Sequence, residues 1–294
     1  GNIGNPPLLE KKIKKQTVFI IEASSYQIFY SKYFKTNHAA ILNLSPDHLE
    51  RHGNINEYAK AKLKLFLNQE KNMYSYMEKN NNILNKNILD NKIKTKLYKI
   101  SYSKYYFFKK KLKNIYLQKK NNLRNIHFVY FICRKFKISD KKIFKSLNSF
   151  EGLKYRNQLI YNKNNLKIIN DSKSTSFSST VGLLSSYNNI FWIVGGMFKK
   201  GDKLTLNSKY YKNIDAYVIG KNKSFFENQL KNKINFKCFT DLKKAILVIK
   251  NKIKKNTTEK TILFSPAAAS FDQFKNFEER GEYFNKVANK ILIK

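Results

Sequence analysis

The sequence predicts an α/β fold made of two domains. Short apolar, β-rich runs alternate with stretches of helical periodicity along nearly the whole chain, a pattern typical of mostly parallel sheets covered by helices. A length of 294 residues suits two domains of ordinary size. Hydrophobic residues make up 42% of the chain and aromatic residues 15%, which is too apolar for a disordered protein.

The first half is expected to contain a sheet with helices between its strands. Strands are expected at residues 17–22 (TVFIIE, a buried strand) and 38–44 (HAAILNL), and a loop at 45–53. Helices are expected at residues 24–35, 55–68, 121–137 and 139–148, the last of them capped by Ser139. The lysine-rich stretch 71–120 carries little periodicity, and we expect short strands and one helix there.

In the second half, expected strands and helices alternate more clearly. Two short strands flank the sequence NKNN (162–165), which predicts a hairpin. Further strands are expected at residues 190–196, 214–220, 234–239 and 260–266. Helices are expected near 176–187, between the last three of these strands, and at 275–292. This order of strands and helices predicts a second α/β unit.

The segment 151–158 (EGLKYRNQ) contains the only glycine between Gly53 and Gly182, and we place a domain boundary there. The two expected domains are therefore residues 1–152 and 153–294. No internal repeat is visible.

The chain is strongly basic. Lys and Arg number 58 against 20 Asp and Glu, a formal net charge of +38. Such a field attracts nucleic acid non-specifically. However, the lysines are spread over the whole chain and no zinc-finger, RNA-recognition or helix-turn-helix signature accompanies them. We therefore expect a solvated surface and no specific nucleic-acid partner. A basic nucleic-acid-binding protein remains the alternative from a different class, which a steep salt dependence of duplex binding would favour.

The sequence also indicates in which compartment the protein acts. No apolar run approaches the roughly 20 residues of a membrane span, and residues 1–15 have no apolar core of signal-peptide length. Two cysteines, Cys133 and Cys238, do not make a disulfide framework. We expect a cytoplasmic protein without a membrane span, acting as a monomer.

Polar side chains at the ends of the first two expected strands suggest a metal site. Glu22 ends one strand and His48 follows the next, so the two side chains are expected at the same edge of the sheet. Lys62 follows on the next helix. A carboxylate and an imidazole can hold a divalent metal. The alternative is that Asp47 caps a helix and His48 lies at the surface.

Three loops of the second half carry polar or small residues directly after strands. Residues 170–175 (NDSKST) precede an expected helix, Gly195 and Gly196 end a strand, and 265–272 (SPAAASFD) follow another. Each signal alone also suits an ordinary cap or turn. Because the loops are expected at one edge of one sheet, together they favour a binding site there.

These stretches resemble the Mur ligases, the ATP-dependent amide-forming enzymes of peptidoglycan synthesis, and in particular the members that add D-glutamate. The matching stretches, in the family's order, are GNIG (1–4), EASSYQ (22–27), ILNLSPDHLERHG (41–53), YAKAKLKLF (58–66), FEGLKYR (150–156), NDSKST (170–175), GGMFKKGD (195–202) and SPAAASFDQFKNFEERG (265–281). The resemblance implies that the first half of the chain is what remains of a central ATPase domain. It implies that the second half is a Rossmann-like domain that binds the amino acid.

The resemblance also implies a role for individual residues. It makes Glu22, His48 and Lys62, the last as a carbamate, catalytic ligands of Mg²⁺. It assigns ATP to Asn122, Asn125, Arg156 and Asp171. It assigns UDP-N-acetylmuramoyl-L-alanine to Asn2 and Ser24. It assigns D-glutamate, the acceptor, to Thr175, Lys199, Ser270, Phe271 and Phe277.

The chain departs from the family pattern in three places. The Gly-rich phosphate loop, G-x-x-x-x-G-K-[ST], occurs nowhere in the sequence, and we expect the chain to be an N-terminally truncated ligase that is inactive by itself. The Gly-x-His-Asn before the nucleotide asparagine reads Lys119-Lys120-Asn121-Asn122, and the His-Arg pair reads Tyr155-Arg156. A Mur ligase that adds another amino acid is the nearest alternative.

Overall fold

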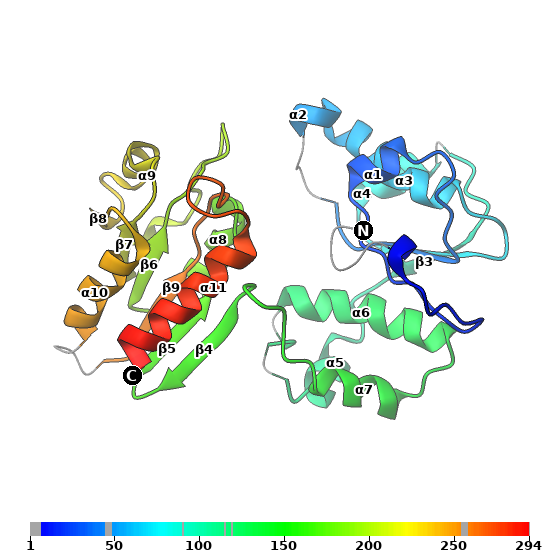
Figure 1. The fold of residues 1–294 in the computed structure, drawn as a ribbon. Helices are drawn as coiled ribbons and strands as arrows, with labels where there is room; N and C mark the ends of the chain where they lie inside the picture. Colours follow the sequence, from blue (N-terminus) through cyan, green and yellow to red (C-terminus); the bar gives the residue numbers. More distant parts are fainter. Residues whose placement is uncertain are drawn as a thin grey trace. The chain divides into compact units, whose positions relative to one another are not determined.

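The computed structural model describes residues 7–44, 49–89, 91–114, 116–118, 120–253 and 258–293, with the side chains of residues 49, 50, 120 and 121 left out. The chain divides into two units, Gly1–Phe150 and Glu151–Lys294, each with its own sheet (Figure 1). None of the described helices is long and apolar enough to cross a membrane.

The first unit is built on three parallel strands in the order β1-β2-β3. These strands are β1 (His38–Ile41), β2 (Tyr74–Glu78) and β3 (Lys96–Ile100). The helices described in the unit are α1 (Ser25–Tyr30), α2 (Leu49–His52), α3 (Ile55–Leu67), α4 (Asn82–Leu89), α5 (Tyr105–Lys111), α6 (Lys120–Lys135) and α7 (Asp140–Asn148).

Helices cover both faces of this small sheet, because successive side chains of a strand point to opposite faces. Met77 packs with Leu63 and Phe66 of α3 on one face. Its neighbour Tyr76 packs with Phe128 of α6 on the other face. The rest of α6 joins α5 and α7 in a separate apolar cluster. Ser139 caps α7 by accepting from the Lys142 backbone amide, so the predicted cap is confirmed.

The strand predicted at residues 17–22 is wrong. Residues 17–22 have no regular structure, and their apolar side chains are exposed, with Ile20 96% accessible. A strand needs a neighbour for its backbone hydrogen bonds, and among the described residues β1 pairs with β2 alone. The segment is apolar, but it pairs with none of the described strands.

Other local predictions for the first unit differ in smaller ways. The predicted loop 45–53 contains the short helix α2, and residues 71–120 contain two helices, α4 and α5, where one was expected. The predicted helix at 24–35 is reduced to α1, whose six residues end where Ser31 adopts an extended conformation.

The second unit is built on six strands in the order β4-β5-β9-β6-β7-β8. The strands are β4 (Gln158–Lys163), β5 (Leu166–Asn170), β6 (Ile190–Val194), β7 (Ile214–Val218), β8 (Asn235–Cys238) and β9 (Lys260–Phe264), and the helices are α8 (Phe177–Leu184), α9 (Lys223–Leu230), α10 (Leu242–Ile253) and α11 (Phe277–Ala288). β4 is antiparallel to β5 and all other neighbours are parallel. The β4–β5 hairpin turns at Asn164 and Asn165, both with positive φ, as the sequence predicts.

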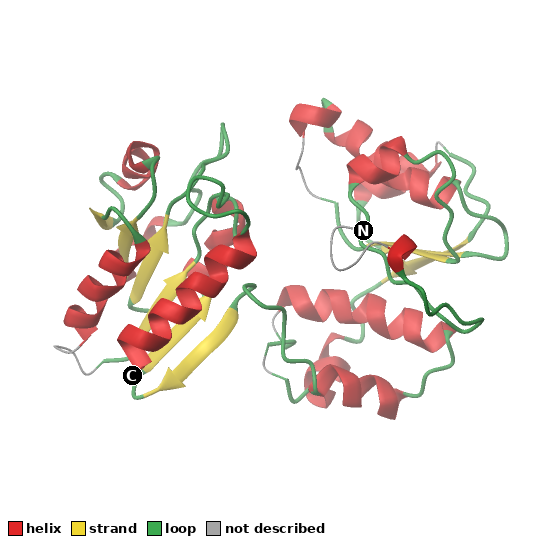
Figure 2. Ribbon diagram, in the orientation of Figure 1, coloured by secondary structure: helices red, strands yellow, loops and turns green. Residues whose placement is uncertain are grey.

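Helices cover both faces of the second sheet, as the Rossmann-like prediction requires (Figure 2). Trp192 of β6 lies in the cluster formed with α8 and α9. Its neighbours Phe191 and Ile193 lie in the cluster formed with α10 and α11. All five residues of β6 are buried, which explains why its sequence is apolar throughout rather than alternating.

Candidate functional site

The candidate site lies at the carboxyl edge of the second sheet. Since β5, β6, β7 and β9 run parallel, the segments that follow them emerge at one edge. The backbone ties these segments together: the Gly195 amide donates to the Pro266 carbonyl over 2.9 Å, and the Ile219 amide donates to the Val194 carbonyl over 2.8 Å. The polar loops that the sequence placed at one edge are therefore neighbours.

Asp171 is the acidic centre of this edge. It directly follows β5 and is only 8% exposed. Its Oδ1 accepts from the Asn157 backbone amide at 2.9 Å, and its Oδ2 accepts from the Ser265 hydroxyl at 2.8 Å. The carboxylate thus joins the segment before β4 to the loops that follow β5 and β9.

Arg280 lies beneath the same edge. This residue of α11 is 2% exposed. Its Nε donates to the Ser172 hydroxyl at 3.1 Å, and its Nη2 donates to the carbonyls of Ser172 and Ala268 at 2.7 and 2.9 Å. Burial lowers the pKa of Arg280 to about 10, against the opposing influence of the Asp272 carboxylate.

Glycines let the strand ends approach one another at this edge. Gly195 has φ of 131°, and a Cβ placed on it would lie 2.0 Å from the Ile219 carbonyl oxygen. Gly220 has φ of 90°, and a Cβ there would lie 2.7 Å from Asp272 Oδ2. Both positions therefore exclude a side chain for reasons of conformation and of space.

The loop between β5 and α8 carries Lys173 and also Thr175, which the resemblance assigns to D-glutamate. The Lys173 ammonium lies 3.9 Å from the centre of the Phe277 ring, a cation–π distance. Thr175 is exposed, two residues before α8 begins at Phe177. The structure thus brings Lys173 and Phe277 into contact and leaves the Thr175 side chain accessible to a ligand.

The loops after β6 and β9 place the other predicted acceptor residues. Lys199 is exposed on the loop after β6, which Asp202 ties to α8 by accepting from the Phe177 amide at 2.8 Å. Ser270 is buried, whereas its neighbour Phe271 is 67% exposed. In this structure Phe271 is therefore accessible to solvent, whereas Ser270 is not.

Arg156 is fixed to the second unit by its neighbours. The Tyr155 carbonyl accepts from the Lys173 amide at 2.9 Å, and the Tyr155 hydroxyl donates to Glu282 Oε2 at 2.7 Å. Burial and this carboxylate raise the pKa of Tyr155 to about 12. Tyr155 has a positive φ of 61°, a rare conformation for a bulky residue. Arg156 and Asp171, both expected to hold ATP, therefore lie on one rigid frame.

The structure describes two of the three residues that are expected to hold magnesium in the first unit. Glu22 is exposed, and the Lys62 ammonium on α3 lies 4.9 Å from the centre of the Tyr58 ring. His48 lies outside the described residues. Among the residues that are described, no three His, Cys, Asp or Glu side chains group as metal ligands. The magnesium site therefore stays a prediction, and we derive no reaction step through the metal.

The remaining predicted residues of the first unit are placed as follows. Asn2 lies outside the described residues. Ser24 is the N-cap of α1, with its hydroxyl accepting from the Gln27 amide at 3.2 Å. Asn122 and Asn125 are one turn apart on α6, and Asn122 donates to the Tyr116 carbonyl at 2.7 Å. The two asparagines share a helix face, as a common ligand would require.

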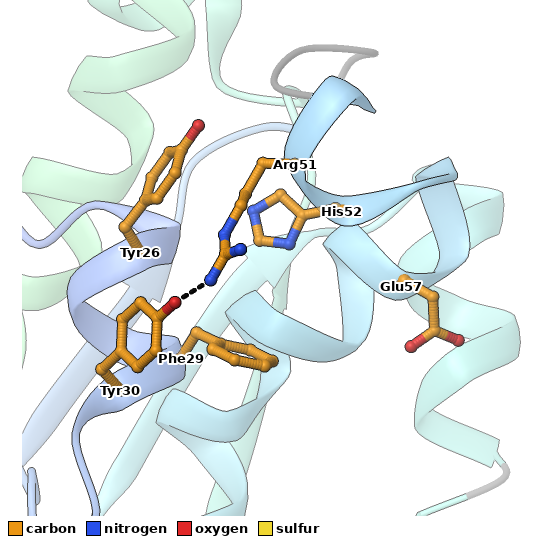
Figure 3. Close-up of a pocket in the computed structure, with 6 residues that line it drawn as sticks. All are labelled: Tyr26, Phe29, Tyr30, Arg51, His52 and Glu57. Atoms are coloured by element: carbon orange, nitrogen blue, oxygen red, sulfur yellow. Dashed lines mark hydrogen bonds between the residues drawn. The ribbon is translucent and has the colours of Figure 1, made fainter.

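A cavity of about 240 Å³ lies between residues of α1, α2 and α3. Figure 3 shows the side chains that line it. It is lined by Tyr26, Phe29, Tyr30, Arg51, His52 and Glu57. Arg51 donates to the Tyr30 hydroxyl, and His52 Nε2 lies 3.0 Å from the Ser25 hydroxyl. Aromatic rings and two basic groups thus meet where α1, α2 and α3 converge, an arrangement that the sequence did not reveal.

Sequence reasoning also missed two residues of the second unit. Arg280 lies in the stretch 265–281, but nothing in its local pattern distinguishes it from a surface arginine of an amphipathic helix. Ser265 was noted only as part of a small-residue loop. In the structure, its hydroxyl joins Asp171 to Thr180 over 2.8 and 2.9 Å. The sequence offered one signal for these two residues: both lie inside the long stretch 265–281 that matches the family.

Comparison with known protein families is consistent with this geometry. Residues 2–143 match the family model for the Mur ligase middle domain. The UDP-N-acetylmuramoylalanine–D-glutamate ligase of Rickettsia bellii is 35% identical over 314 residues, which covers 100% of this chain and 69% of the relative. The enzyme of the same name from Rickettsia prowazekii is 34% identical, covering 99% of this chain and 69% of the relative.

Solved structures share the fold at low sequence identity. A MurF structure from Acinetobacter baumannii is 13% identical, with a TM-score of 0.62, covering 91% of this chain and 63% of that one. The MurC structure from Thermotoga maritima is 14% identical, with a TM-score of 0.58, covering 90% of this chain and 62% of that one. At this identity the likeness concerns the fold alone.

Proposed function

We propose, since this chain belongs to the Mur ligase family, that it is the ATP-dependent ligase that joins D-glutamate to UDP-N-acetylmuramoyl-L-alanine in peptidoglycan synthesis. The observation that carries the proposal is the carboxyl edge of the second unit, where the loops with the family's motifs meet around Asp171. We also infer that the ligase acts in the cytoplasm, where ATP and its nucleotide-linked substrate are found. We infer that it acts as a monomer.

The proposed reaction has two steps. The L-alanine carboxylate attacks the γ-phosphorus of ATP, ADP leaves and an acyl phosphate forms. The D-glutamate amine then attacks the acyl carbon and loses a proton, and inorganic phosphate leaves. Magnesium, when bound, would offset the repulsion between the two anions, with Glu22, His48 and carbamylated Lys62 as its proposed ligands.

The second unit is proposed to position D-glutamate. Lys199 is an exposed cation that suits one carboxylate, and the Thr175 hydroxyl suits the other as a hydrogen-bond donor. Ser270, Phe271 and Phe277 are proposed to line the same pocket. Holding the acceptor in this way would replace a collision in solution by a prearranged encounter with the acyl phosphate.

Asn122, Asn125, Arg156 and Asp171 are proposed to hold the nucleotide. Asp171 and Arg156 share one frame in the second unit, and Asn122 and Asn125 share one face of α6. Asn2 and Ser24 are proposed to contact the UDP-linked substrate. Because the 294 residues contain no Gly-rich phosphate loop, the chain by itself is proposed to be inactive.

A chimera tests the proposal directly. The part of the Rickettsia bellii relative that precedes its match to Gly1 would be joined to this chain, and amide formation would be followed by mass spectrometry. We expect product with D-glutamate, and none with L-alanine, L-lysine or meso-diaminopimelate. Product with one of those acceptors instead would favour the alternative ligase, and a chimera that folds but ligates none of them would refute the proposal.

A further inference from the structure

Arg280 joins the loops that follow two different strands. Its Nε and Nη2 reach the hydroxyl and the carbonyl of Ser172, after β5, and Nη2 also reaches the Ala268 carbonyl, after β9. The Ser172 hydroxyl in turn donates to the Phe277 carbonyl at 2.9 Å. One planar guanidinium therefore holds the loop of Lys173 and Thr175 against the loop of Ser270 and Phe271.

The loop after β6 packs against the same guanidinium. A Cβ placed on Gly196 would lie 3.2 Å from Arg280 Nη1 and 2.5 Å from the Ala269 carbonyl oxygen. Met197 and Ala269 exchange two backbone hydrogen bonds of 2.9 Å. The loop that carries Lys199 is therefore fastened to the β9 loop directly above Arg280.

An arginine is an unexpected choice for a purely packing role here. Its side chain is buried, and Nη1 has no hydrogen-bond partner among the described residues. No ion pair of Arg280 occurs among the described side chains within 4.0 Å. A buried cation without a paired carboxylate is destabilising, and an apolar residue of similar volume often serves packing better. The fork geometry of the guanidinium supplies what an apolar residue lacks.

We propose that Arg280 is the positioning residue of the acceptor site, holding the loops after β5, β6 and β9 in the arrangement that binds the carboxylates of the amino-acid substrate. The inference rests on the proposed function for the identity of that substrate. Arg280 itself does not touch the ligand, because the guanidinium is sealed from solvent. It acts through Lys173, Thr175 and Lys199, whose loops it fixes.

Two substitutions of Arg280 separate its proposed positioning role from the effects of its charge and of its side-chain volume. Arg280→Lys keeps the charge but loses the fork, and Arg280→Met keeps much of the volume but loses both. Lys286→Met removes an exposed cation from the same helix and serves as the matched control. All four proteins are the full 294-residue chain.

The first measurement needs no ligand. We expect amide hydrogen exchange in residues 171–175, 195–202 and 265–272 to become at least tenfold faster in both Arg280 variants. Exchange in α9 and α10 should stay as in the wild type, which separates loop release from general unfolding. If exchange rises only next to residue 280, or equally over the whole unit, the positioning role is wrong.

The second measurement is calorimetric titration with D-glutamate, and with glutarate, which keeps both carboxylates but has no amine. We expect both Arg280 variants to bind at least tenfold more weakly than the wild type, and Lys286→Met to bind normally. Wild-type affinity in either Arg280 variant would overturn the proposal. If the wild type binds neither compound, the proposed acceptor is wrong, and the exchange experiment alone decides the role of Arg280.

Discussion

The backbone amide of Asn157 donates to Asp171 Oδ1 over 2.9 Å, and this bond ties the segment that carries Arg156 to the loop after β5. Asn157 and Tyr155, on either side of Arg156, both have positive φ, of 46° and 61°. Non-glycine residues adopt this conformation only where surrounding contacts enforce it. The contacts here come from Asp171, Lys173 and Glu282, so Arg156 belongs to the second unit.

Lys62 is predicted to be essential for turnover in the chimera described above. Lys62→Ala should lower kcat by about a hundredfold or more, because it removes the proposed anionic metal ligand. Added formate or acetate should restore part of the activity by supplying a carboxylate. Lys60→Ala, on the same helix but exposed, should stay active. Wild-type turnover in Lys62→Ala without any rescue agent would contradict the role.

Lys199 is predicted to select the acceptor. A charge-assisted hydrogen bond contributes about 1.5–3 kcal/mol, so Lys199→Ala in the chimera should raise the KM for D-glutamate by about tenfold or more. The KM for ATP should not change. Steady-state kinetics with each substrate varied in turn measure both values, and Lys212→Ala controls for lost surface charge. A change confined to the ATP KM would mean that Lys199 serves the nucleotide.

The 294-residue chain alone is predicted to hydrolyse no ATP. Its sequence contains no Gly-rich phosphate loop, and Lys173 and Gly195-Gly196 are proposed to serve the acceptor side instead. The purified chain would be assayed for phosphate release with UDP-N-acetylmuramoyl-L-alanine, D-glutamate and Mg-ATP. The chimera provides the positive control. Release above background by the chain alone would show that phosphate binding has another source.

The exposed apolar segment of the first unit is predicted to limit solubility. Val18 and Ile20 are 60% and 96% accessible, so their side chains are available for self-association. Ile20→Ser should raise the concentration at which the chain aggregates, measured by light scattering, without changing the melting temperature of the second unit. Ile262→Ser, at a fully buried position of β9, should instead lower that melting temperature. Unchanged aggregation in Ile20→Ser would contradict the prediction.

Cys238 is predicted to react slowly despite its exposed position. Partial desolvation of the sulfur and the Glu227 carboxylate, 2.9 Å from it, raise the pKa of the thiol to about 12. A higher pKa leaves less of the reactive thiolate at pH 8. Iodoacetamide labelling at pH 8 should therefore be at least tenfold slower than for a free thiol, and faster in Glu227→Gln. Equal rates in the two proteins would show that Glu227 does not control the thiol.

The second unit was largely predictable because its signals are local. An apolar strand such as Ile190–Val194 is buried on both faces, so its composition alone identifies it. The Asn164-Asn165 turn, like the Ser139 cap in the first unit, depends on residues close to one another in sequence. The family resemblance supplied the roles of Asp171, Thr175 and Lys199, which spacing alone had left as ordinary caps and loops.

The sequence by itself determined the α/β class, the Rossmann-like second unit and the family, since these depend on composition, periodicity and ordered motifs. Only the tertiary structure decided that the apolar residues 17–22 form no strand, because a strand requires a neighbour that its own sequence does not contain. Only the tertiary structure identified Arg280, whose partners Ser172 and Ala268 are brought to it by strands β5 and β9. Local chemistry can be read from adjacent residues, whereas contacts across a hundred residues exist only after the sheet has formed.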